Sequence, residues 1–141
     1  MFSPVPCDLE NNTATYGYDP IHVRSEDPHA ARAYWENTFG ATVVQERELG
    51  GAPSFTFDLN GMRFLVSGRA EGEHPVKSGS EPRYGLDHFG LLVDDRDSAA
   101  VDLRAKGAEF ICEPWEIRPG VKIAFVKGPD NISIDLVQRN D

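Results

Sequence analysis

The sequence predicts an α+β fold made of two β-α-β-β-β modules in tandem. Each half of the 141-residue chain opens with a strand-like segment that carries a histidine, then continues into an acidic helix start and a helix that ends at a glycine. Gly40 follows His22 by 18 positions, and Gly107 follows His88 by 19. This spacing indicates a duplication with a histidine at the same place in each copy. Since neither module can cover its own sheet, we expect the strongly curved mixed sheets of the pair to enclose a cavity.

The first module is expected over residues 20–67, after an irregular N-terminal arm over residues 1–19. Asp27 is a good helix N-cap, Pro28 suits the first helical position, and Gly40 ends the helix. The strands of this module are expected at 21–24, 42–48, 53–59 and 62–67, the last two joined by the tight-turn signal Asn60-Gly61.

The second module is expected over residues 86–138, after a linker rich in glycine, proline and mixed charge over residues 68–85. A helix cap near Asp95–Asp97 and a stop at Gly107 give the second helix. The strands of this module are expected at 86–93, 109–112, 122–127 and 132–138. The whole of residues 20–138 therefore reads as one domain of two modules.

Composition narrows the class of function. The formal net charge of -9 provides no basic stripe for phosphates, which argues against nucleic-acid binding. Two cysteines in no metal or redox spacing favour a reducing compartment. No stretch has the length and apolarity of a membrane span or a signal peptide. We therefore expect a cytoplasmic protein that handles a small molecule.

Strand alternation assigns three potential metal ligands to the cavity. Side chains alternate across a strand, so His22 and His88 point away from the apolar residues that pack under the helices. On the last strand Asp135 lies between Ile134 and Leu136 on the opposite face, where an unpaired carboxylate is costly to bury. Two imidazoles and one carboxylate on a cavity wall form the triad that holds Fe(II), Mn(II) or a similar ion. The alternative is a metal-free binding protein whose histidines hydrogen-bond a ligand or water.

Three stretches carry a resemblance to a known superfamily: Leu86–Asp95, Ile117–Phe125 and Gly128–Leu136. With the repeat, they resemble the vicinal-oxygen-chelate superfamily of glyoxalase I, acyl-CoA epimerases, extradiol dioxygenases, fosfomycin-resistance transferases and bleomycin-binding proteins. The resemblance covers about residues 20–138. It implies metal ligands on the first and last strands of each module, here His22, His88 and Asp135.

Two departures from the superfamily pattern bear on the reaction. Asp135 stands where a glutamate is usual, and its shorter side chain reaches less far. Phe64 is the expected counterpart at the end of module one, and it cannot bind a metal. The site would therefore have three protein ligands rather than four.

The resemblance implies three alternative functions. The first is a divalent-metal-dependent lyase or isomerase like glyoxalase I or an acyl-CoA epimerase, which chelates neighbouring oxygens of a small anionic substrate. The second is an Fe(II)-dependent extradiol-type dioxygenase, and the third is a metal-free antibiotic-binding protein. The sequence does not distinguish Fe, Mn, Ni, Co and Zn, and it identifies no general base. A homodimer is implied as well, with the site either within one chain or shared between two.

Further residues are candidates for the substrate side of the site. Arg24 shares the face of His22 and suits an anionic group, as does Arg118, while Trp115 could line the mouth of the cavity. Tyr84 and His74 are the candidates for proton transfer, from positions in or beside the linker.

Overall fold

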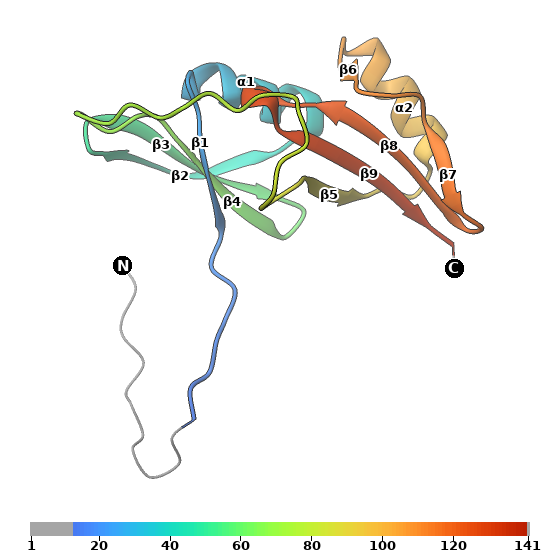
Figure 1. The fold of residues 1–141 in the computed structure, drawn as a ribbon, viewed down its shortest axis with the longest axis horizontal. Helices are drawn as coiled ribbons and strands as arrows, with labels where there is room; N and C mark the ends of the chain where they lie inside the picture. The colour runs from blue at the N-terminus through green and yellow to red at the C-terminus, as the bar shows by residue number, and fades with distance from the viewer. Residues whose placement is uncertain (1–12, 141) are drawn as a thin grey trace.

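The computed structural model describes residues 13–140 and consists of two sheets, each covered on one face by a helix (Figure 1). Residues 13–20 form no regular element, and residues 1–12 of the predicted arm lie outside the described part. None of the helices in the described part of the chain is long and apolar enough to cross a membrane. The elements are β1 (Ile21–Arg24), α1 (Pro28–Phe39), β2 (Thr42–Leu49), β3 (Ala52–Leu59), β4 (Met62–Ser67), β5 (Phe89–Leu92), α2 (Arg96–Ala105), β6 (Glu109–Phe110), β7 (Trp115–Arg118), β8 (Val121–Lys127), a 3-10 turn (Pro129–Asn131) and β9 (Ser133–Arg139).

Module one forms a four-stranded sheet in the order β1-β4-β3-β2, in which only the β1–β4 pair is parallel. The predicted caps of α1 are confirmed. The Asp27 carboxylate accepts a hydrogen bond from the Ala30 N–H at 3.1 Å, and Gly40 closes the helix at φ 71°. Glycine suits that left-handed conformation because it has no Cβ. β1 lies at one edge of this sheet, with β4 as its neighbour.

Module two repeats this order, with β5-β9-β8-β6 as its path and β7 also paired with β8. The strand predicted over residues 86–93 is shorter, so that His88 directly precedes β5. The counterpart of β2 is divided into β6 and β7, which pair with successive parts of β8. Pro114 lies in this interruption and has no N–H to donate to the ladder, which accounts for part of the break.

One apolar core joins the two modules. The Trp35 side chain on α1 is 1% exposed and packs edge-on against Phe64 of its own sheet and against Phe89 of the other module, with ring centroids 4.7 and 6.0 Å apart. Phe57 stacks on Phe64 beneath it. Burial of such large rings is a major stabilising term, so Trp35 fixes the modules to one another.

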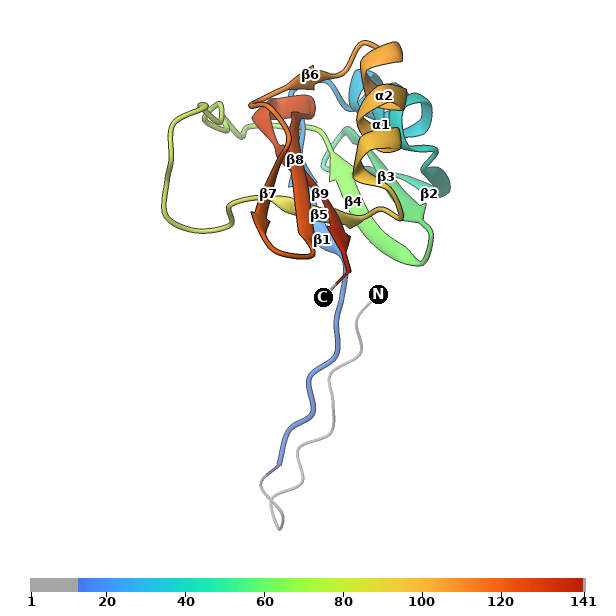
Figure 2. The same ribbon diagram turned by 90° about the vertical axis from the view of Figure 1, so that its right-hand side faces the viewer.

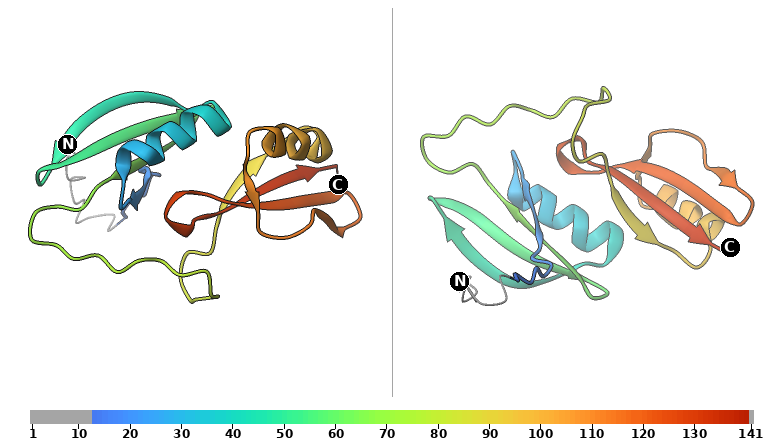
Figure 3. Two further views of the ribbon diagram at one scale, coloured as in Figure 1. Left: turned by 90° about the horizontal axis from the view of Figure 1, so that it is seen from above. Right: turned by 60° about the horizontal axis from the view of Figure 1, so that its bottom comes forward.

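The two sheets lie side by side and share no strand pairing within residues 13–140 (Figure 3). The linker over residues 68–85 leaves β4, loops away from the helices and returns to β5 (Figure 2). β1, which carries His22, and β5, which follows His88, are both edge strands. Each therefore has one side without a strand partner among residues 13–140. The face of each sheet opposite its helix is the face on which the candidate ligands lie.

Candidate metal centre

The predicted alternation of side chains is confirmed on the strands around the candidate ligands. Ile21 and Val23 pack against the core, whereas His22 is exposed on the other face of β1. On β9, Ile134 and Leu136 are 0% and 1% exposed in the same core. The residues between them therefore face away from the helices, as the sequence predicts for Asp135.

The structure brings two of the three predicted ligands together. The Nε2 atom of His88 lies 3.7 Å from Oδ2 of Asp135, while its Nδ1 atom lies 2.7 Å from a carboxylate oxygen of Asp87. The ring of Phe125 packs edge-on against the imidazole at 5.1 Å between centroids. The neighbouring carboxylate and the ring contact together fix the orientation of the imidazole and aim Nε2 at Asp135.

Asp135 is buried without a full set of hydrogen-bond partners. The residue is 7% exposed, and its Oδ1 atom has no hydrogen-bond donor among residues 13–140. Burial raises the pKa of this carboxyl, because the charged form loses water; the charges of His88 and Arg139 act in the opposite direction. A buried and incompletely paired carboxylate is unfavourable for folding, and a bound cation would remove that cost.

The donor chemistry of this pair fits a divalent ion. An imidazole nitrogen and a carboxylate oxygen suit Zn, Mn, Fe, Co or Ni. A metal-binding histidine typically donates its other N–H to a carboxylate, and Asp87 occupies that place beside His88. Two donors are nevertheless fewer than the three of most catalytic metal sites. Among residues 13–140 no group of three or more His, Cys, Asp and Glu side chains is placed to hold one ion.

His22 lies in the other sheet and has a serine as its partner. Its Nε2 atom is 2.5 Å from the hydroxyl of Ser67 at the end of β4. In the parallel β1–β4 ladder His22 stands opposite Leu65, and Ser67 lies two residues further along. His22 therefore does not join His88 and Asp135 within this chain, and its assignment as a metal ligand stays a prediction.

The two histidines also occupy different positions in their modules. His22 is the second residue of β1 and precedes the helix cap Asp27 by five positions. His88 comes before β5 and precedes the cap Asp95 by seven. The expectation of a histidine at the same place in each copy was therefore wrong by two residues, which is one step along the same face of a strand.

Strand pairing gives the correct correspondence between the modules. Ile21 stands opposite Phe64 on β4, just as Phe89 stands opposite Ile134 on β9. His22 of module one therefore corresponds to Gly90 of module two. The module-two residues His88 and Asp135 correspond to Pro20 and Leu65 of module one.

The proposed counterpart of Asp135 in module one is corrected by the same pairing. Phe64 is 0% exposed and lies in the core between Trp35 and Phe57, on the helix side of the sheet. Leu65, on the opposite face, is the true counterpart. Neither Phe64 nor Leu65 can bind a metal, and neither can Pro20, the counterpart of His88. Module one therefore has no ligand at the two positions that correspond to the His88–Asp135 pair.

The remaining predicted residues do not join the pair. Arg24 forms an ion pair with Glu73 at 2.6 Å. Trp115 on β7 is 39% exposed and stacks on Phe125, which in turn contacts His88. Three others lie on exposed segments: Arg118 on β7, His74 in the linker beside Arg69, and the fully exposed Tyr84. Their substrate and proton-transfer roles stay predictions.

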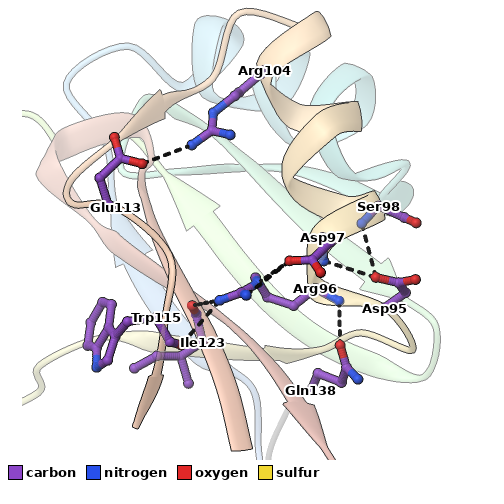
Figure 4. Close-up of polar contacts among 9 residues, drawn as sticks. All are labelled: Asp95, Arg96, Asp97, Ser98, Arg104, Glu113, Trp115, Ile123 and Gln138. Atoms are coloured by element: carbon purple, nitrogen blue, oxygen red, sulfur yellow. Dashed lines mark hydrogen bonds and ion pairs between the residues drawn. The ribbon is translucent and has the colours of Figure 1, made fainter.

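Arg96 was missed by sequence reasoning and holds β7 in place (Figure 4). Its guanidinium donates to the backbone carbonyls of Ile123 and Trp115 at 2.9 and 3.2 Å, and its backbone N–H donates to Gln138. The side chain is only 11% exposed. Ser67 and Asp87 were missed as well, because a hydroxyl or carboxylate beside a histidine gains significance only once the strand register is known.

The face of module two opposite α2 is apolar around the pair. Val137 and Ile123 are buried there, Phe125 packs on them, and Gly90 has open space where a side chain would be. Larger apolar side chains nearby are exposed to solvent: Leu92 at 77%, Ile117 at 56% and Trp115 at 39%. Such an exposed apolar patch around two polar groups is typical of a surface that binds a ligand or a protein.

Known proteins share this fold and part of the sequence. The family model of the Glyoxalase/Bleomycin resistance protein/Dioxygenase superfamily matches residues 17–136. A lactoylglutathione lyase of Arabidopsis thaliana is 38% identical over 56 residues, which are 39% of this chain and 20% of that protein. A variant of glyoxalase I from Zea mays superposes with a TM-score of 0.69 at 22% identity, over 85% of this chain and 43% of that one.

A third relative was solved with a metal ion. The fosfomycin resistance protein FosX of Listeria monocytogenes, complexed with Mn(II) and sulfate, gives a TM-score of 0.64 at 16% identity, over 89% of this chain and 93% of that one. At such identities the solved structures establish the fold alone. The family model spans most of the chain, which therefore belongs to the Glyoxalase/Bleomycin resistance protein/Dioxygenase superfamily.

Proposed function

We propose that this chain is a divalent-metal-dependent lyase or isomerase that acts on a small, oxygen-rich, anionic substrate. The observation that carries the proposal is the His88–Asp135 pair. One buried oxygen of Asp135 lacks a donor among residues 13–140, and an oriented imidazole nitrogen of His88 faces the other oxygen. A cation between the two groups would satisfy both. The partial match to lactoylglutathione lyases favours lyase or isomerase chemistry over oxygenation.

His88 and Asp135 would hold the ion, and Asp87 would keep the His88 ring in place. When bound, the ion would supply charge that polarises a substrate carbonyl and favours loss of a proton from the adjacent carbon. The apolar floor under Phe125 would exclude water from the reacting carbon. Since the chain provides two donors, positions would remain open for two neighbouring substrate oxygens.

The complete site is proposed to form between two copies of the chain. Module one and module two each have an open edge strand next to a candidate residue, β1 at His22 and β5 at His88. The exposed apolar side chains Leu92 and Ile117 lie on the module-two face that a second copy would cover. A symmetric dimer would therefore set module one of one copy against module two of its partner and make two equal cavities.

Elemental analysis with variants tests the metal part of the proposal. The wild-type chain, purified without added metal and then loaded, is expected to bind one divalent ion, while the His88→Ala and Asp135→Asn variants are expected to bind none. The adduct of methylglyoxal and glutathione, which isomerises to lactoylglutathione, is the first substrate to test. A wild-type protein that takes up no metal would contradict the proposal and favour the metal-free binding protein. Iron with oxygen uptake on catechols would favour the dioxygenase.

A further inference from the structure

We propose that His22 is the proton-transfer residue of this site, held in position by Ser67. The inference rests on the proposed function, because it assigns the proton acceptor that a lyase or isomerase needs. It starts from the difference in register between the modules, which puts His22 at the position of Gly90 rather than that of His88, on the sheet face away from α1.

The contacts of His22 suit an acid-base residue. The hydroxyl of Ser67 meets Nε2 at 2.5 Å, and Ser67 is itself 3% exposed. The backbone carbonyl of Ser67 accepts a hydrogen bond from the Ser25 N–H at 2.8 Å, which ties the serine to the segment after β1. A hydroxyl can both donate and accept, so Ser67 can hold the ring in either protonation state. The second ring nitrogen, Nδ1, is then the atom that exchanges a proton with substrate.

The register explains why His22 is better suited to this role than to metal binding. The position that corresponds to His88 is Pro20, and the position that corresponds to Asp135 is Leu65. His22 lies two residues beyond Pro20 on the same face and pairs with Leu65, at the position that Gly90 holds in module two. A proton-transfer group needs only hydrogen-bond reach of the reacting carbon, whereas a metal ligand must reach the ion itself.

Module two provides no free acceptor for the proton. Asp135 is committed to the ion under the proposed function, and Asp87 is bonded to His88. On module one, the cross-strand neighbours of His22 are Leu65 and Thr56, neither of which is a base at neutral pH. His22 is therefore the imidazole that the assembled cavity offers for this step.

The step is balanced within the substrate. Nδ1 of His22 takes the proton from the carbon next to the substrate carbonyl, and the C–H bonding pair moves toward the carbonyl oxygen to give an enediol-type anion. The imidazolium then returns the same proton to the former carbonyl carbon, while the hydroxyl proton on the first carbon passes to the other oxygen, so that the first carbon becomes the new carbonyl. No oxidant or reductant is required, and the residue ends in its starting state.

The test compares His22→Gln with Asp58→Asn. Glutamine can still hydrogen-bond Ser67 but cannot carry the proton. Asp58 is a matched control, because strand alternation puts this carboxylate on the same sheet face, opposite Arg63. Two readouts are measured on each protein: the bound metal per chain, and the rate of turnover of the adduct of methylglyoxal and glutathione to lactoylglutathione.

For His22→Gln we expect metal binding equal to that of the wild type and a loss of turnover of roughly 10²–10⁴-fold, with partial recovery on addition of free imidazole. For Asp58→Asn we expect both readouts to match the wild type. Ser67→Ala should lower kcat with little change in KM, and Ser67→Thr, which keeps the hydroxyl, should restore it.

Loss of metal from His22→Gln would show that His22 is a ligand and overturn the inference, as would full turnover by that variant. A wild-type protein that binds no metal and turns over no substrate would instead contradict the proposed function.

Discussion

Replacing Asp135 by leucine is predicted to stabilise the metal-free protein while abolishing metal binding. The substitution copies module one, where Leu65 occupies the corresponding position. The buried Oδ1 atom of Asp135 has no donor among the described residues, and an unsatisfied buried group costs about 1–3 kcal/mol. Space next to Gly90 is open, so the larger side chain can be accommodated. The expected gain is therefore about 1–3 kcal/mol.

Thermal unfolding of metal-free protein measures this gain. For a chain of this size, about 1 kcal/mol corresponds to a rise of roughly 3–4 °C in Tm, so the predicted rise is roughly 3–10 °C. Asp135→Asn is the matched control, because it removes the charge but keeps a polar group. It is expected to give a smaller rise.

The pH dependence has a defined sign. Burial raises the pKa of Asp135, so the folded chain keeps this proton at a pH at which the unfolded chain has lost it. The stability from this group is fully present below the ordinary aspartate pKa of about 3.9 and is lost as pH rises through the higher folded value. The leucine variant lacks this loss, so its advantage should grow with pH over that window. A leucine variant less stable than wild type at pH 7 without metal would refute the reasoning.

Three further predictions concern the pair, the dimer and the core. Asp87→Asn should weaken metal binding by about 10–100-fold without unfolding the chain, as measured by metal titration. A mixed dimer of His22→Gln and His88→Ala chains should regain up to half of the wild-type activity per dimer if each site is shared between copies; no recovery after subunit exchange would mean sites within single chains. Trp35→Ala should lower the free energy of unfolding by about 3–5 kcal/mol, measured by denaturant titration, because this ring joins both modules; a loss below about 1 kcal/mol would contradict that role.

Much of the fold could be predicted because the local signals are strong. The caps at Asp27 and Asp95, the Asn60-Gly61 turn and the strand alternation all correspond to features of the structure. These signals depend on short-range geometry that each residue type carries with it. The predicted strand over residues 109–112 ends before Pro114, but strand β7 after this proline was missed.

The site was harder to predict because it depends on register. Counting from each histidine to the glycine after the helix suggested equivalent positions, but α1 has 12 residues and α2 has 10. From helix cap to that glycine the first module is one residue longer, which offset part of the shift of two residues between His22 and His88. The unequal distance from each histidine to its helix cap, five residues against seven, already indicates the shift. The pairing of β1 with β4 and of β5 with β9, a long-range feature, then identifies which residues correspond.

The central claim is that His88 and Asp135 form the metal-binding pair and that His22 is not part of it. Titration of metal-free protein with Mn2+ tests it most directly, with wild type, His88→Ala, Asp135→Asn and His22→Gln compared side by side. We predict one ion per chain for wild type and for His22→Gln, and none for the other two variants. Retention of the ion by His88→Ala and Asp135→Asn would contradict the claim.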